Sequence, residues 1–229
     1  MKQKTAPTES EITRTIKCSK NIFSFCEYMN YKYDSSHGLR EFKPNRYEII
    51  LLRKFVTAAN FPTRPNVIAV SPRQTGRSTA LAVYALWYAI FNSDRTVIIT
   101  SPRLEMSRII LDQIEKFYDS LTIVKPGFRN KNKDELFLWN GSRIIVTACQ
   151  KYSMVHGRKI DLLLIDDADV IPQRHFEDFI ACIFPMMMGS VNTQTILTAS
   201  GEILKNTSFN TLLSQANAGL NSFIPAELD

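Results

Sequence analysis

The chain has 229 residues, of which 45% are hydrophobic and 22% charged, and its formal net charge is +6. These values fit one large folded α/β domain, or one domain with a small appendage, and argue against a disordered chain. The four cysteines form no C-x-x-C pair, so we expect free thiols rather than a zinc site.

The bulk properties also bear on partners. The most apolar predicted helix, residues 80–91, is too short to span a bilayer, so no membrane partner is expected. The basic excess permits nucleic acid as a partner, but it fits a solvated surface equally well.

The first 45 residues are expected to form a helical lead-in. Residues 1–8 are mostly polar, and apolar positions between residues 9 and 29 predict two short helices. A further helix is predicted at residues 46–60. We therefore divide the chain into a lead-in or lid segment at residues 1–45 and a larger domain at residues 46–229.

From residue 66 onwards, strands alternate with helices. Asn140 and Gly141 between two apolar runs predict a β-hairpin. The alternation predicts a mainly parallel α/β sheet with helices on both faces, carrying this one antiparallel hairpin. The predicted strands are an apolar run from residue 66, then 96–100, 136–139, 143–147, 162–165, 195–198 and 223–225, and the predicted helices are 77–92, 104–121, 176–184 and 208–218.

Residues 66–79, NVIAVSPRQTGRST, combine a short apolar run, a tight turn and the start of a helical pattern. This is the layout of a Walker A-type phosphate-binding loop, in which free amides at a helix N-terminus bind phosphate. Gly76 would let the backbone approach, Arg77 would place charge on the outer phosphates, and Ser78 would offer its hydroxyl to Mg²⁺. The other predicted nucleotide-binding residues of this loop are Gln74, Thr75 and Thr79.

The loop departs from the pattern G-x-x-x-x-G-K-[ST] at two positions. Ser71 stands where the first glycine would be, and Arg77 where the lysine would be. The alternative is an ordinary strand–turn–helix in which Gly76 relieves the turn and Ser78 caps the helix.

A second motif, DLLLIDDADVI at residues 161–171, favours nucleotide binding. Its apolar run predicts a parallel strand buried on both faces, and Asp166 and Asp167 follow at the carboxyl end, the edge where ligands of open α/β sheets collect. One carboxylate can hold Mg²⁺, as in a Walker B motif, and the next can orient the attacking water. A polar strand end that caps a helix is the alternative, but two such motifs at one edge favour a nucleotide site.

Five motifs, in this order, resemble the ATPase domain of the terminase large subunit, the DNA-packaging motor of tailed phages and herpesviruses. The resemblance covers about residues 18–229. It rests on residues 18–28, the loop PRQTGRST at 72–79, NGSRI at 140–144, VHG at 155–157, and Thr198, Ala199 and Ser200, which resemble the motif that couples hydrolysis to motion.

The resemblance implies roles for individual residues. Arg73 lies at the position of an arginine that stabilises the transition state, a task that suits a guanidinium beside the γ-phosphate. Asp166 and Ser78 lie at the Mg²⁺ positions. Asp167 lies at the position of the catalytic glutamate, and Tyr47 lies at an aromatic residue near the adenine.

Four residues depart from the family pattern. Arg77 replaces a lysine, and Asp167 replaces the catalytic glutamate with a side chain one methylene shorter. Glu48 replaces the glutamine that would read adenine. His156 replaces the arginine of a loop in which Arg158 could substitute. We also expect the family's C-terminal nuclease to be missing from this chain, which offers no acidic metal cluster of that kind.

Two functions of different classes follow. The first is a P-loop ATPase domain at residues 46–229 that uses ATP and Mg²⁺ to drive double-stranded DNA into a procapsid. For it the resemblance implies a portal protein and a small terminase subunit as partners, a homo-oligomeric ring, and a place in the host cytoplasm, transiently at the procapsid portal. The second is a degenerate module that binds nucleotide or a partner with little or no hydrolysis. A nucleotide-free α/β domain is the remaining alternative.

Four cations precede the predicted hairpin and are expected to form a basic loop. They are Lys125, Arg129, Lys131 and Lys133. Such a loop could contact a DNA backbone without reading bases, or it could simply be solvated.

Overall fold

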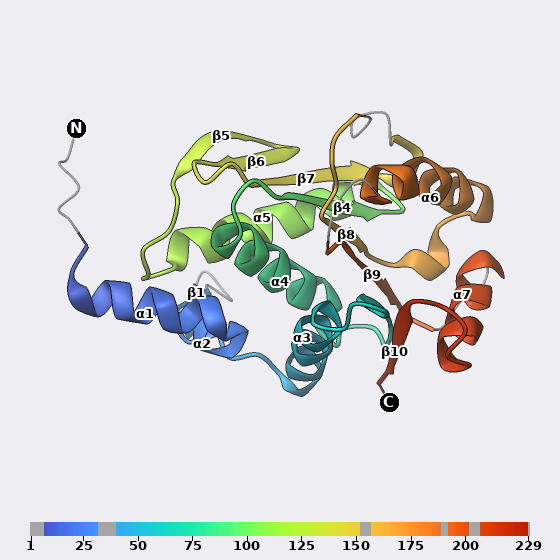
Figure 1. The fold of residues 1–229 in the computed structure, drawn as a ribbon, viewed down its shortest axis with the longest axis horizontal. Coiled ribbons are helices and arrows are strands. Elements are labelled where there is room, and N and C mark those ends of the chain that lie inside the picture. Colours follow the sequence, from blue (N-terminus) through green and yellow to red (C-terminus); the bar gives the residue numbers. More distant parts are fainter. Residues whose placement is uncertain (1–6, 32–39, 152–156, 189–191, 202–206, 229) are drawn as a thin grey trace.

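The computed structural model describes residues 7–31, 40–151, 157–188, 192–201 and 207–228 (Figure 1). Its centre is an eight-stranded sheet in the order β10-β3-β9-β8-β4-β7-β6-β5. Strands β10 to β7 of that order pair in parallel, whereas β6 and β5 pair antiparallel. The strands are β3 (Asn66–Val70), β4 (Thr96–Ser101), β5 (Phe128–Asn132), β6 (Glu135–Leu138), β7 (Arg143–Ala148), β8 (Leu162–Ile165), β9 (Gln194–Ala199) and β10 (Phe223–Glu227). The predicted mainly parallel α/β sheet is confirmed.

The buried strands divide their side chains between two cores. In β3, Val67 and Ala69 belong to one core and Ile68 to the other, because successive side chains of a strand point to opposite faces. Helices on both faces of the sheet complete these cores (Figure 1). Helices α2 (Ile22–Cys26), α3 (Arg46–Ala59), α4 (Arg77–Phe91) and α5 (Leu104–Ser120) contribute to the first core, and α6 (Gln173–Met188) and α7 (Thr207–Asn217) to the second.

The N-terminal segment is helical, as expected. Helix α1 (Glu9–Lys20) begins with a capping box in which Thr8 and Glu11 bond each other's backbone amides. Phe25 and Cys26 of α2 are buried in the same core as α4. A two-stranded ribbon, β1 (Asn30–Tyr31) with β2 (Arg40–Glu41), leads towards α3. The division of the chain at residue 45 stays a prediction, since lead-in and larger domain share this core.

The prediction of a basic loop before the hairpin is wrong about its conformation. Residues 128–132 form β5, an edge strand that pairs with β6, so the antiparallel part has three strands rather than two. The sequence FRNKN has one apolar residue, because an edge strand with both faces largely exposed needs no hydrophobic pattern. Lys131 pairs with Glu115 at 2.6 Å, and Lys125 donates to the carbonyl of Leu121 at 3.0 Å.

Helix α6 also differs from its expected end at residue 184. It continues through Pro185 to Met188. A proline removes one backbone donor, and the carbonyl this leaves free belongs to Ala181, which is exposed and can be solvated.

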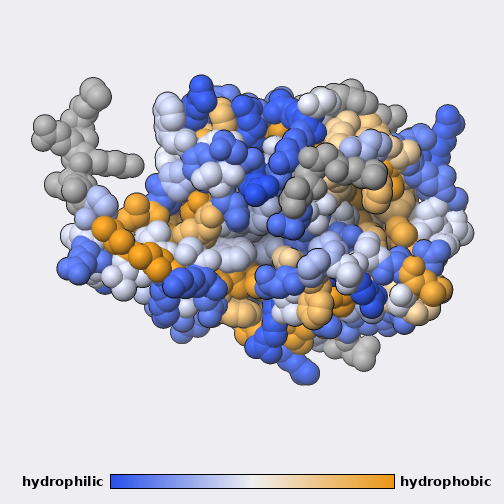
Figure 2. Space-filling view, in the orientation of Figure 1, coloured by the Kyte–Doolittle hydropathy of each residue, from blue (hydrophilic) through white to orange (hydrophobic). Residues whose placement is uncertain are grey.

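Apolar surface is visible in several places, among them along α1 at the left and over α6 and α7 at the right (Figure 2). The exposed large apolar side chains include Ile12, Ile16 and Phe184. Within the described ranges, no helix has both the length and the apolar content that crossing a membrane requires.

Candidate nucleotide-binding site

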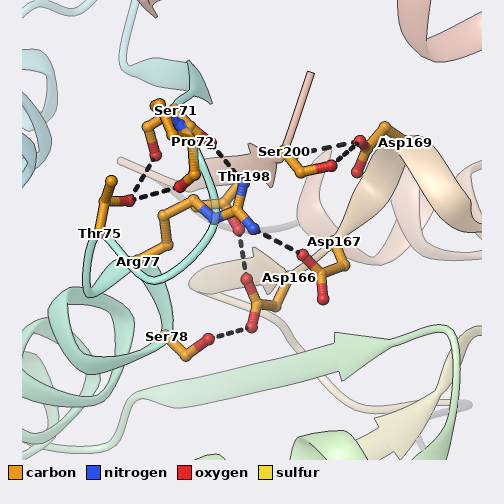
Figure 3. A network of polar contacts seen from close by, with 10 residues as sticks. All are labelled: Ser71, Pro72, Thr75, Arg77, Ser78, Asp166, Asp167, Asp169, Thr198 and Ser200. Carbon is orange, nitrogen blue, oxygen red and sulfur yellow. Dashed lines mark hydrogen bonds and ion pairs between the residues drawn. The ribbon is translucent and has the colours of Figure 1, made fainter. Parts of the chain in front are cut away.

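The candidate site lies at the carboxyl ends of three neighbouring parallel strands (Figure 3). In the sheet, β9 lies between β3 and β8. The loop of residues 71–76 follows β3, Asp166 and Asp167 follow β8, and Thr198 lies near the end of β9. Parallel strands end at the same edge, so these groups meet there as the sequence predicted.

The loop of residues 71–76 is closed by its own polar groups. Thr75 donates from its hydroxyl to the carbonyl of Pro72 at 2.9 Å, and its hydroxyl lies 2.9 Å from that of Ser71. Gln74 and Gly76 both have positive φ angles, of 63° and 90°. Ser71, which stands at the position of the first motif glycine, therefore contributes a hydrogen bond that closes the turn.

Helix α4 begins directly after this loop. Its N-cap residue, Gly76, has no side chain, and no side chain caps this end. The amides of Arg77, Ser78 and Thr79 therefore have no intrahelical acceptor, and the helix dipole is positive here. Such a helix start can bind an anion. The hydroxyl of Thr79 is occupied elsewhere, since it accepts a hydrogen bond from Gln113 at 3.1 Å.

Arg77 is buried, and its guanidinium reaches back over the loop. It donates to the carbonyl of Ser71 at 2.9 Å and to Asp167 at 3.0 Å. Arg77 and Asp167 are two of the residues that depart from the family pattern, and they bond to each other. Arg77 is longer than the family's lysine and Asp167 is shorter than the family's glutamate, and the two side chains still make contact.

Asp166 is the point at which three elements join. Each of its carboxylate oxygens accepts one hydroxyl: that of Ser78 at 2.6 Å and that of Thr198 at 2.5 Å. Only 3% of Asp166 is exposed. A carboxylate flanked by a hydroxyl is an oxygen donor set of the kind that Mg²⁺ accepts.

Asp167 is more exposed than Asp166, with 25% of its side chain accessible. Its backbone is left-handed, with φ of 50°, which turns the chain sharply after β8. Burial and the neighbouring charge of Asp166 raise the pKa of Asp167 to about 6, although Arg77 opposes that shift. A carboxylate with this pKa is suited to accept a proton near neutral pH.

Three consecutive residues at the end of β9 contact three parts of the site. Thr198 bonds Asp166, and the carbonyl of Ala199 accepts the amide of Ser71 at 3.1 Å. Ser200 donates to Asp169 from both its amide, at 3.1 Å, and its hydroxyl, at 2.8 Å. Sequence reasoning missed Asp169. The available signal was a third carboxylate in DDAD, immediately before the apolar Val-Ile pair.

Glu48 lies behind the loop, in the first turn of α3. Its carboxylate accepts the amide of Asn45 at 2.7 Å in a capping box, and the Asn45 side chain donates to the carbonyl of Thr75 at 3.2 Å. Burial raises the pKa of Glu48. The adjacent Tyr47 is half-buried. The expected roles of Tyr47 and Glu48 at adenine stay predictions.

The remaining predicted residues are Arg73, Arg158 and His156. Arg73 is exposed on the loop, close enough for its charge to lower the pKa of Asp167 slightly. Arg158 pairs with Glu135 of the hairpin at 3.6 Å. His156, at the departure from the family's arginine, lies outside the described residues.

The fold is that of phage large-terminase ATPase domains. That domain of the large terminase from Thermus phage P74-26 matches with a TM-score of 0.58 at 16% identity, over 81% of this chain and 85% of that one. The bacteriophage HK97 large terminase matches with a TM-score of 0.69 at 14% identity, over 91% of this chain and 43% of that one. The large terminase of a thermophilic bacteriophage in complex with ATP-γ-S matches with a TM-score of 0.56 at 10% identity, over 81% and 45%.

The sequence itself matches a family. Residues 68–202, more than half of the chain, match the family described as terminase large subunit, T4likevirus-type, N-terminal. The chain therefore belongs to the terminase large subunit family, as its motifs predicted. It spans less than half of the whole terminases from HK97 and from the thermophilic bacteriophage.

The contact between Glu48 and Gly76 gives a first prediction. A Cβ at Gly76 would lie 2.3 Å from Oε1 of Glu48, so Gly76→Ala must both strain the backbone and displace the capping carboxylate. We expect the backbone strain to cost about 1–3 kcal/mol and the overlap about 1–3 kcal/mol more, measured by urea unfolding.

The matched control is Gly219→Ala. Gly219 also has a positive φ, of 72°, but a Cβ there meets nothing within 4 Å. It should therefore suffer the backbone strain alone. Equal losses of stability in the two variants would contradict the proposed contact.

Proposed function

We propose that this chain is the ATPase domain of a DNA-packaging motor, which hydrolyses ATP with Mg²⁺ and couples that reaction to the translocation of double-stranded DNA into a procapsid. The observation that carries the proposal is the meeting of an uncapped helix start with two carboxylates at one sheet edge. Family membership and the nucleotide bound to the thermophilic bacteriophage terminase support it.

The proposed nucleotide lies with its phosphates over the start of α4. Free amides at that end would bind the phosphate oxygens, and Arg77 and Arg73 would balance their charge. Asp166 and Ser78 would hold Mg²⁺, which draws charge from the phosphate oxygens. The donor set supports this assignment, because both side chains offer oxygen and already lie in contact.

Asp167 is the proposed general base. Its raised pKa would let it orient a water and take up its proton as the water attacks the γ-phosphate. Arg73 would then stabilise the charge that develops on the transferred phosphoryl group. The bond from Arg77 to Asp167 positions the base, so the two departures from the family pattern form a compensated pair in this proposal.

One observation favours the second candidate function, a nucleotide- or partner-binding module without turnover. The guanidinium of Arg77 is already bonded to both Ser71 and Asp167, so neither group is free for phosphate or water unless these bonds change. Turnover therefore distinguishes the two functions, whereas nucleotide binding does not.

The proposed partners follow from the packaging role. They are double-stranded DNA, a portal protein and a small terminase subunit, with copies of this chain in a ring and residues 1–45 as a lid. The proposed location is the host cytoplasm, and transiently the procapsid portal.

Nucleotide binding can be tested by thermal unfolding. At about 100 times the Kd, ATP with Mg²⁺ should raise the Tm by roughly 5–10 °C, because a ligand that binds only the folded state stabilises it. Arg77→Ala should lose most of that shift. The control is Arg174→Ala, since the side chain of Arg174 is 90% exposed on α6 and should keep the full shift. A full shift in Arg77→Ala would remove this residue from the binding site.

Hydrolysis can be tested through the pair of Arg77 and Asp167. Asp167→Asn should lower kcat by about 100-fold or more with little change in nucleotide affinity, because an amide cannot accept the proton. Arg77→Lys and Asp167→Glu should each lower kcat alone, and the double variant should recover most of the loss. A coupling energy of about 1–3 kcal/mol is expected from steady-state phosphate release.

Two results would contradict these roles. Strictly additive effects in the double variant would mean that the two residues act independently. Wild-type turnover that persists unchanged in Asp167→Asn would mean that another residue positions the water. Background turnover in the wild type, with nucleotide still bound, would favour the binding module.

DNA contact is proposed for the outward face of the three-stranded antiparallel part. Arg143 and Arg158 share the carboxylate of Glu135, and Arg129 lies over the rings of Phe137 and Trp139. Two guanidiniums thus share one carboxylate and a third lies over neighbouring rings, and this excess of positive charge favours a polyanion.

Loss of these charges should weaken DNA binding at all sequences. Arg129→Ala and Arg143→Ala should each reduce the slope of log K against log salt by about 1, since each phosphate contact releases counterions. Fluorescence anisotropy with labelled duplex DNA provides the measurement, and Arg174→Ala is the control. A slope that is unchanged in both variants would sink this assignment.

A further inference from the structure

Asp169 carries a contact that the site described so far does not use. It lies in the single turn η2 (Ala168–Val170) and is 0% exposed. Its Oδ2 accepts both the amide and the hydroxyl of Ser200, while among the described residues its Oδ1 has no hydrogen-bond partner. A buried carboxylate oxygen without a partner is costly. That cost suggests that the carboxylate serves more than folding.

The turn around Asp169 is hydrogen-bonded to Asp167. The amide of Val170 bonds the carbonyl of Asp167 at 3.2 Å, and the amide of Ile171 bonds the carbonyl of Ala168 at 3.4 Å. Ala168 and Ile171 are buried. Asp167 and Asp169 therefore lie on one short turn that is held by its own backbone bonds and by burial of its apolar residues.

Ser200 is the first residue after β9. Gly201 follows it with a positive φ of 73°, and a Cβ there would lie 2.8 Å from Val70, so the chain turns away at this point. Thr198 and Ala199 are tied to Asp166 and Ser71, respectively, while Ser200 is tied to Asp169. Asp169 is thus the group that connects the Asp167 turn with the exit of β9.

We propose that Asp169 is a positioning residue, which holds the Asp167 turn in register with the end of β9 through its two bonds to Ser200. The proposal rests on the proposed nucleotide site. It adds a residue to those that would place the base.

The test compares kinetics with stability. Asp169→Ala should lower the kcat for ATP by about 10-fold or more with KM within about 2-fold, because a base that is misplaced by about 1 Å loses rate rather than binding. Asp169→Asn keeps an oxygen that can accept from Ser200, so it should recover most of the rate. Ser200→Ala removes one of the two bonds and should give an intermediate loss that does not add to that of Asp169→Ala.

The control is a buried carboxylate of the same sheet outside the site. Asp161 is 1% exposed and accepts Arg95 at 2.8 Å and the amide of Thr96 at 2.9 Å. Asp161→Asn should lower the Tm without changing the kcat of the folded protein. If Asp169→Ala does the same, its role is merely structural and the proposal is overturned.

A second measurement separates this inference from the proposed hydrolysis. Hydrogen–deuterium exchange over residues 167–171 and 198–201 is measured without nucleotide. It should be faster in Asp169→Ala than in the wild type and unchanged in Asp161→Asn, even if the wild type proves not to turn ATP over. Equal exchange in the wild type and in Asp169→Ala overturns the proposal.

Discussion

The site depends on one carboxylate that is held between two hydroxyls. Asp166 directly follows a strand buried on both faces, and it accepts the hydroxyl of Ser78 from the start of α4 and that of Thr198 from the neighbouring strand. Donors on both oxygens lower the cost of burying a carboxylate, and here each donor comes from a different element. This requirement fixes the loop, the acidic turn and β9 relative to one another within hydrogen-bond tolerance.

Around Asp166, further carboxylates and one guanidinium lie close together. Asp166, Asp167 and Asp169 lie within four residues, and burial together with the charge of Asp166 raises the pKa of Asp167 to about 6. Arg77 offsets part of this repulsion by crossing from the loop to Asp167. Burial among nearby carboxylates thus raises the pKa of Asp167, the proposed base, and the ion pair with Arg77 limits that rise.

Much of this arrangement was predictable from the sequence, because it follows from strand order. Apolar runs that end in polar residues located the loop after β3 and the carboxylates after β8, and the family resemblance supplied Thr198, Ala199 and Ser200. The partners of Arg77 were not predictable, since a side chain that folds back over its own loop leaves no periodic signal. Glu48 was predicted at adenine, but its capping bond to Asn45 depends on where α3 begins. Strand β5 was missed because an exposed edge needs no hydrophobic alternation.

The two edges of the eight-stranded sheet bear on how copies of the molecule behave at high concentration. One edge is β10, where Pro225 lacks a backbone donor, and the other is β5, where charged side chains line the strand. Both features oppose the addition of a further strand from another molecule. Neighbouring copies are therefore not expected to join their eight-stranded sheets into one at either of these two edges.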